Sequence, residues 1–290
     1  MTSGVMAVPP RAPYGRPVTR THPPAPRTHH QRGVGELLRE WRHRRRVSQL
    51  ELAVTADVSA RHLSFVETGR AAPSRDMVLL LCAHLDVPLR ERNQLLLAAG
   101  YAPVYAEHAL TAPELAAVRD AVRGLLRGHE PYPAVVVDRK WNLVEANSSI
   151  AVLVDGVAPA LLEPPVNVLR ATLHPNGMAP RIANLGEWRA HLLGRLRREV
   201  DVTADPDLTD LLRELRGYPC AEPVPEVLAP NPGDLVVPLR FRYGGIELAF
   251  FSTVATFGTP LDVTLAELSI ESFFPANAAT AAVLRGDGNL

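Results

Sequence analysis

The residues best suited to molecular recognition lie between positions 49 and 70, where two short helical segments follow each other. Gln49 stands at the start of the first segment, where its side-chain amide can reach a phosphate. The second segment begins at Ser59, and its spacing places Leu63 and Val66 inside. The resulting candidates for contact with double-stranded DNA are Gln49, Ser59, Ala60, Arg61, His62, Ser64, Phe65 and Arg70.

Structural interpretations of these residues stay open beside the recognition hypothesis. Arg61 also fits a solvated surface arginine, and Phe65 also fits a core residue. His62 and the basic run 42–46 equally fit a solvated helix face. Two helices joined by a short turn occur in any helical bundle. The prediction therefore depends on the ordered set of positions from 36 to 74.

Helix-start and helix-stop signals predict five short helices over residues 34–100. The first shows the helical period in its apolar residues, at positions 34, 37, 38 and 41. Ser48 and Glu51 have the spacing of a capping box, and Ser59 can cap the third helix. Gly69 ends that helix, as expected of a residue in the left-handed C-cap position.

Strand patterns begin after residue 112. Thr111 to Glu114 has the form of another capping box before an amphipathic helix. Short strands are expected at 134–137 and 141–146, and the clearest hairpin turns at Gly244-Gly245. In its register Arg242 faces Glu247, an opposite-charge pair across the strands.

Further elements complete the expected second domain. Helices are expected over 187–200 and 206–215, with Asp205 capping the second, and a third strand over 267–274 can extend the sheet. Residues 107–275 are therefore predicted to form one α+β domain with a mainly antiparallel sheet.

The chain is neutral overall, but its charge is unevenly divided. Residues 1–100 hold 15 arginines, no lysine and 8 acidic residues, a formal charge of +7, and the remainder carries −7. The basic first third is thus the part expected to meet a polyanion. Residues 1–33, rich in proline and arginine, predict a disordered basic tail. The sharper alternative is an arm that touches phosphates or the minor groove.

Enzyme chemistry is not expected. The sequence has no G-x-S-x-G elbow, P-loop, H-E-x-x-H or dinucleotide fingerprint, and its scattered histidines lack acidic partners at metal-ligand spacing. We therefore predict no catalytic residue, metal or cofactor. No apolar run of about 18 residues and no secretory signal occur. The expected location is the cytoplasm, with no membrane partner.

Residues 34–87 resemble the XRE/phage-repressor type of helix-turn-helix. The likeness is carried by Gln49, by Val58-Ser59 and by the E-x-G-R-x-x-P-S run at 67–74. The chain departs from the pattern at Asp57, a position often held by glycine, but aspartate tolerates a left-handed conformation. The resemblance implies that helix 59–67 enters the major groove. Base-facing positions would be Ala60, Arg61 and Phe65, and backbone-facing positions Gln49, Ser59, His62 and Arg70.

The wider organisation resembles the MmyB-like regulators, through residues 63–70, 73–75, 95–103, 133–147, 167–170 and 174–175. The resemblance implies a C-terminal domain of PAS-like fold that holds a small apolar, fatty acid-like ligand between its sheet and covering helices. Candidate ligand contacts are the polar residues Asn147, Arg170, His174 and Arg181 and the apolar strand residues Phe241 and Phe250. Each also fits a purely structural role.

The fold prediction is accordingly a multidomain chain. An all-α, five-helix helix-turn-helix domain over 34–103 is followed by an α+β PAS-like domain with an antiparallel sheet over 107–275, and 276–290 is expected to be a flexible tail. The predicted function is a sequence-specific DNA-binding transcription regulator that acts as a homodimer and responds to the apolar ligand. The alternative is a C-terminal domain that binds a protein partner or mediates dimerisation without a ligand.

Overall fold

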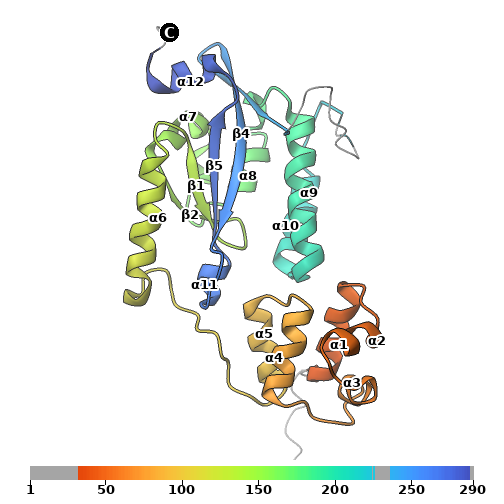
Figure 1. Cartoon of the computed structure of the whole chain (residues 1–290). Helices are drawn as coiled ribbons and strands as arrows, with labels where there is room; N and C mark the ends of the chain where they lie inside the picture. The colour runs from red at the N-terminus through yellow and green to blue at the C-terminus, as the bar shows by residue number, and fades with distance from the viewer. Residues whose placement is uncertain (1–31, 224, 226–235, 288–290) are drawn as a thin grey trace, which may run out of the picture. The chain divides into compact units, whose positions relative to one another are not determined.

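Short capped helices form the first part of the chain in the computed structural model, which describes residues 32–223, 225 and 236–287 (Figure 1). The tail predicted over 1–33 lies almost entirely outside the described residues. The expected five helices are confirmed as α1 (Val34–Arg44), α2 (Gln49–Thr55), α3 (Ala60–Glu67), α4 (Arg75–His84) and α5 (Leu89–Ala98).

The serines predicted as N-caps hold the starts of these helices. The Ser48 hydroxyl accepts a hydrogen bond from the backbone N–H of Glu51 at 3.1 Å, and the Glu51 carboxylate accepts one from the Ser48 N–H at 3.3 Å. This reciprocal pair is the predicted capping box. Ser59 caps α3 through a single hydrogen bond, which its hydroxyl accepts from the His62 N–H at 3.4 Å.

Left-handed residues make the turns between these helices short enough for one core to form. Asp57, which replaces the more usual glycine, has φ +52°, and Gly69 at the end of α3 has φ +71°, as predicted. The helices then bury a common apolar core, formed by Leu38, Trp41, Leu52, Leu63, Val66, Val78, Leu81, Cys82, Leu85, Leu95 and Leu96 among others.

A five-stranded sheet organises the second domain. Its strands are β1 (Ala134–Val137), β2 (Leu143–Ala146), β3 (Leu239–Tyr243), β4 (Ile246–Thr256) and β5 (Ser269–Pro275). Their order is β2-β1-β5-β4-β3, and the pairings are antiparallel. The predicted hairpin register is confirmed, because Arg242 pairs with Glu247 across β3 and β4. The side chain that contacts Glu247, however, is Arg240, with Nε 2.7 Å from Oε1.

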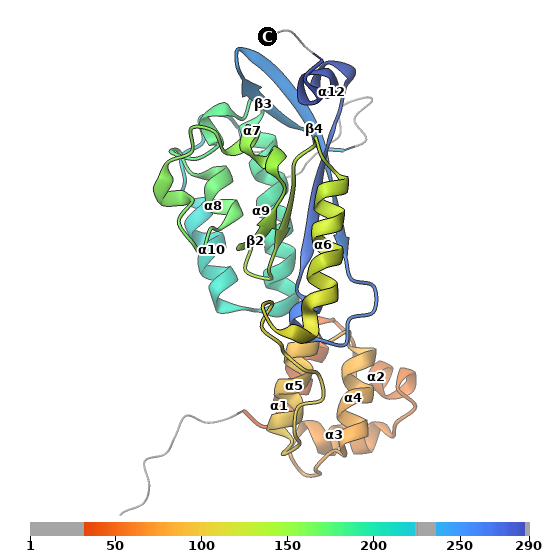
Figure 2. The same cartoon turned by 90° about the vertical axis from the view of Figure 1, so that its left-hand side faces the viewer.

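Helices cover the two faces of this sheet differently (Figures 1 and 2). The long α6 (Ala116–Gly128) packs on the outer face against β1 and β5. On the inner face lie α8 (Val168–Leu173), α9 (Leu185–Thr203) and α10 (Pro206–Arg216), which share the main core with β3, β4 and β5. The shorter elements are η1 (Pro113–Leu115), η2 (Ser148–Ile150), α7 (Ala151–Val154), η3 (Pro159–Leu161), η4 (Ala179–Arg181), α11 (Val263–Ala266) and α12 (Ala278–Arg285).

Two local expectations were wrong. The capping box expected from Thr111 does not form, because the chain enters a 3-10 turn at Pro113–Leu115 without a side-chain cap. The C-terminal residues expected to be flexible include α12, which packs on β4 and β5. Thr280 is 1% exposed, and its hydroxyl accepts a hydrogen bond from the Ala249 N–H at 3.0 Å. The weak apolar pattern of 278–285 does not predict this packing, because a polar hydrogen bond of Thr280 attaches the helix to β4.

Two kinds of functional feature are absent from the described part of the chain. None of its helices combines the length and the apolar character needed to cross a membrane. Within the same residues, no group of three or more histidine, cysteine, aspartate or glutamate side chains is arranged to hold a metal ion.

The packing of α1 on α3 yields a stability prediction. A Cβ at Gly35 would overlap the carbonyl oxygen of Val66, so Gly35→Ala should push these helices apart and lower the free energy of unfolding by about 2 kcal/mol. Gly124, inside α6, has nothing within 4 Å of such a Cβ. The matched control Gly124→Ala should raise stability by up to about 1 kcal/mol. Urea unfolding followed by circular dichroism distinguishes the two, and a stabilised Gly35→Ala would contradict the packing.

Candidate nucleic-acid interface and apolar cavity

Helix α3 is anchored by its apolar side and presents its polar side to solvent. Leu63 and Val66 are each 1% exposed, whereas Arg61 is exposed. The Arg61 guanidinium lies 5.4 Å from the ring centroid of the half-buried Phe65, one turn further along the helix. These two side chains therefore form one continuous surface, and Phe65 is neither fully buried nor isolated.

The other DNA-contact candidates surround this surface. Ala60, His62 and Ser64 are half-buried on α3, and Ser59 is exposed at its N-cap. Arg70 is exposed immediately after the left-handed Gly69, where its backbone N–H donates to the Phe65 carbonyl at 2.8 Å. The structure thus brings the candidates of α3 and its flanks onto one short segment.

A buried carboxylate joins the first three helices beneath this surface. Glu67 accepts hydrogen bonds from Arg42 Nε at 2.7 Å and Nη2 at 2.9 Å, and these bonds raise the pKa of the Arg42 guanidinium. Gln49 Nε2 also donates to Glu67, at 3.0 Å. One amide hydrogen of Gln49 is therefore already used within the protein. The basic run 42–46 is not a uniform solvated face, because Arg42 is only 7% exposed.

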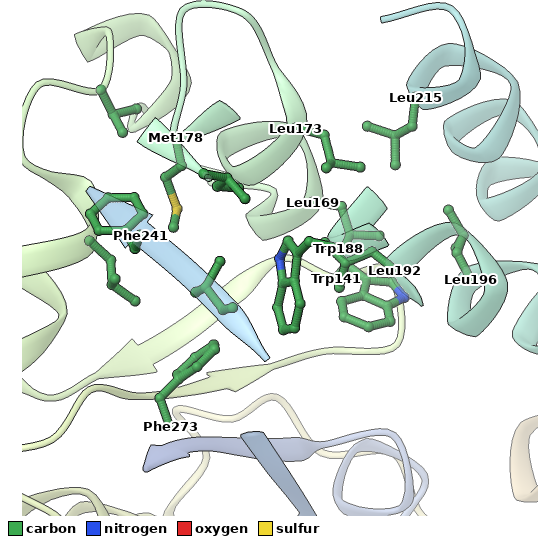
Figure 3. Close-up of a cluster of buried hydrophobic side chains, with 14 of the residues drawn as sticks. Trp141, Leu169, Leu173, Met178, Trp188, Leu192, Leu196, Leu215, Phe241 and Phe273 are labelled. Atoms are coloured by element: carbon green, nitrogen blue, oxygen red, sulfur yellow. The ribbon is translucent and has the colours of Figure 1, made fainter. Parts of the chain in front are cut away.

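An apolar cavity of about 220 Å³ lies in the second domain, between the sheet and the covering helices. Figure 3 shows Trp141, Met178, Trp188 and Phe273 pointing toward the interior of the hydrophobic cluster around it. Among the described lining residues, Glu271 is the one that carries charge. The others are Val135, Trp141, Leu143, Ile150, Leu153, Val154, Leu162, Val166, Val168, Leu169, Ala171, Thr172, Met178, Trp188, Leu192, Leu239 and Phe273.

The turn between β1 and β2 fixes the position of Trp141. The Asp138 carboxylate accepts hydrogen bonds from the backbone N–H groups of Lys140 and Asn142, both at 2.8 Å. The backbone carbonyl of Asp138 accepts a further hydrogen bond, from the Trp141 N–H at 3.0 Å. Trp141 consequently adopts φ +64°, a left-handed conformation that is rare for a bulky residue and points to a specific constraint.

Polar side chains on α9 hold the indole of Trp141 from outside the cavity. Its Nε1 donates to Glu199 Oε2 at 2.6 Å, and the Arg195 guanidinium lies 4.7 Å from its ring centroid. Arg195 Nη1 in turn donates to Glu271 Oε1 at 3.1 Å. Burial raises the pKa of Glu199, and the indole hydrogen bond opposes that shift only in part.

A second hollow, of about 210 Å³, is lined by Arg195 and Glu199. Trp141 lines both this hollow and the apolar cavity. Arg139 lines this hollow, with Nη2 3.0 Å from Asp205 Oδ2 and Nη1 3.7 Å from Glu91 Oε1 in α5. Arg90 of α5 binds Glu267, with Nε 2.7 Å from Oε1. Ion pairs therefore connect the fifth helix of the first domain to residues beside the cavity.

None of the six predicted ligand contacts lines the apolar cavity. Arg170 pairs with Glu214 at the surface, and the His174 ring accepts from the Asn176 N–H. Arg181 donates to the Leu153 carbonyl and covers the Phe241 ring. The remaining two are the buried core residue Phe250 and the buried Asn147, whose amide bonds the backbone at Leu126, Tyr132 and Ala134.

Two residues that sequence reasoning missed occupy the central positions instead. The strand expected over 141–146 begins only at Leu143, and Trp141 lies in the turn before it. A tryptophan directly after the D-R-K turn is the sequence signal for this position. Glu271 lies within an apolar strand, S-I-E-S-F-F, where a single carboxylate is unusual enough to indicate a partner or a ligand.

Comparison with known families matches both parts of this arrangement. Residues 34–95 match a helix-turn-helix domain, and residues 118–286, more than half of the chain, match the MmyB-like transcription regulator ligand binding domain. No curated protein matches the chain.

The raised pKa of Glu199 predicts that the stability difference between wild type and a Glu199→Gln variant depends on pH. The Glu199 carboxyl holds its proton more tightly in the folded protein than in the unfolded chain. Its contribution to the stability of the folded state is therefore full below about pH 4.3, the usual pKa of an unfolded glutamate. That contribution is lost as the pH rises through the higher pKa of the folded state. Glu199→Gln keeps an oxygen that can accept from Trp141 but cannot ionise. The thermal midpoint of the variant relative to wild type should therefore rise from pH 4 to pH 7.

Circular dichroism melts across this range measure the difference. The exposed Glu114→Gln serves as control and should change stability by less than about 0.5 kcal/mol throughout. A difference between Glu199→Gln and wild type that is the same at every pH would contradict the prediction.

Proposed function

The chain belongs to the MmyB-like family of transcription regulators, and on that basis we propose that a small apolar ligand in its C-terminal domain sets its affinity for DNA. It is a DNA-binding regulator with a helix-turn-helix domain and a ligand-binding domain. The observation that carries the proposal is the apolar cavity beside residues that form ion pairs with α5. We place its action in the cytoplasm.

The proposed DNA contacts follow from the exposed side of α3. Arg61 can donate two hydrogen bonds to the O6 and N7 atoms of one guanine, and Phe65 can contact a thymine methyl group. Ser59, His62 and Arg70 would position the helix on phosphates. Two copies in a homodimer would place their α3 helices in successive major grooves, about 34–36 Å apart.

The proposed ligand is a small apolar molecule whose aliphatic chain is like that of a fatty acid. Dry apolar cavities of about 150 Å³ are known to bind molecules the size of benzene. A space of about 220 Å³ with an almost wholly apolar lining suits a short or medium aliphatic chain. The alternative, a C-terminal domain that only binds protein, is expected to have a filled core, so the cavity supports the ligand hypothesis.

The proposed coupling runs through the turn 138–141. A ligand beside Trp141 would contact the same turn that carries Arg139, whose ion pairs reach Glu91 of α5. If the turn has two conformations, a ligand that binds one of them more tightly shifts the equilibrium toward that conformation. The size of the shift is set by the difference between the ligand's affinities for the two. Typical couplings of this kind change affinity about 5- to 150-fold.

Stripping the protein of bound molecules tests this coupling. Native mass spectrometry would identify a co-purifying molecule, and octan-1-ol would serve as the probe for stripped protein. We expect DNA affinity to differ at least about fivefold between stripped and octanol-saturated protein. Arg139→Gln should retain octanol binding and lose most of that difference.

The control Arg213→Gln removes an exposed ion pair of α10 with Asp210 and should leave the coupling intact. Equal DNA affinity of stripped and saturated wild type would refute the regulatory proposal, and a search for protein partners would follow.

Arg61 provides the test of sequence reading. Selection from a randomised duplex library defines the DNA site that the wild-type protein prefers. Arg61→Ala should then reduce the difference in binding free energy between this site and unrelated DNA by about 1–3 kcal/mol. Weak, salt-sensitive binding to all sequences should persist. Fluorescence anisotropy on both duplexes measures this, with Arg213→Ala as control. Equal loss on both duplexes would reassign Arg61 to the backbone.

A further inference from the structure

We propose that the cavity selects amphiphiles whose head group donates hydrogen bonds and carries no negative charge, with Glu271 as the acceptor. This inference rests on the proposed ligand-binding function and adds the chemistry of the ligand's polar end. It makes Glu271 the specificity-determining residue of the cavity. The ligand class is thus a short aliphatic alcohol or amine rather than a carboxylate anion.

The position of Glu271 carries the first part of the argument. It lies on β5 two residues before Phe273, so both side chains project from the same face of the sheet, and both line the cavity. The Glu271 side chain is only 7% exposed. A carboxylate placed in a space of otherwise apolar character needs a hydrogen-bonding partner.

Arg195 supplies such a partner on one side only. Its Nη1 donates to Oε1 at 3.1 Å from the direction of the second hollow, and its guanidinium is held over the Trp141 ring. Within the described part of the chain, no other group donates a hydrogen bond to the Glu271 carboxylate. The Arg195 charge is thereby directed at Glu271 rather than at the cavity, and Oε2 still has lone pairs to offer.

The other polar groups of the lining do not compensate a ligand anion. The Trp141 indole N–H donates to Glu199, and the Thr172 hydroxyl donates to the Val168 carbonyl at 2.7 Å. A carboxylate ligand would therefore meet the Glu271 carboxylate in a space of low polarity, where like charges repel strongly. A hydroxyl or ammonium group can instead donate to Oε2.

Three probes with the same eight-carbon chain separate these cases: octylamine, octan-1-ol and octanoate. Trp141 and Trp188 both line the cavity, so tryptophan fluorescence of the full-length protein reports occupancy, while Trp41 in the first domain gives a constant background. At pH 7.5 we expect saturable quenching by the amine and the alcohol. Octanoate should bind at least about tenfold more weakly, because a like charge at contact distance shifts equilibria by that much or more.

Glu271→Gln should reverse this order. The variant removes the negative charge and leaves Arg195 without its ion-pair partner, so octanoate should gain at least about tenfold and octylamine should lose as much. Glu247→Gln is the matched control, because this glutamate lies on the same sheet in an exposed pair with Arg240. It should keep the wild-type order.

Each outcome bears on a different claim. Tightest binding of octanoate by wild type would overturn the head-group inference and leave the ligand-binding proposal standing. Absence of saturable quenching by all three probes would overturn both. The wild-type series requires no substitution, so its result holds even if Glu271→Gln does not fold.

Discussion

The turn fixed by the Asp138 side chain is the constraint on which the second domain's arrangement depends. Its hydrogen bonds to the backbone of Lys140 and Asn142 hold Trp141 in a left-handed conformation that an unsupported chain avoids. Arg139 of this turn lines the second hollow, near α5. Trp141 lines both that hollow and the apolar cavity. The Asp138 carboxylate thus holds a conformation that the backbone disfavours, and this turn connects two spaces whose described lining residues have Trp141 alone in common.

Glu67 plays a comparable part in the first domain. Burying a carboxylate is costly unless its oxygens are well paired, and here Arg42 and Gln49 provide three hydrogen bonds from two other helices. Such a group tolerates few alternative packings of α1, α2 and α3. The buried Glu67 carboxylate therefore fixes the helix from beneath, while Arg61 lies on its exposed side.

Local signals allowed much of this fold to be predicted. Ser48, Ser59 and the Gly244-Gly245 turn act through neighbours within a few residues, so their spacing alone identified helix starts and a hairpin. The cavity could not be predicted in this way, because an unfilled space results from packing between elements distant in sequence. The polar candidate Asn147 satisfies backbone groups instead, and the charged residue at the cavity, Glu271, lies inside a mainly apolar strand.

The division of labour along α3 has a consequence for how such proteins diversify. Leu63, Val66 and Glu67 hold the helix in place, while Arg61 and Ser64 contribute little to the core. On the proposed role of α3 in reading DNA, replacing the latter pair would exchange one target sequence for another without disturbing the second domain. Under the proposed regulation, duplicated copies of the gene would acquire new sets of controlled genes while keeping the same ligand, and the two properties would evolve at separate rates.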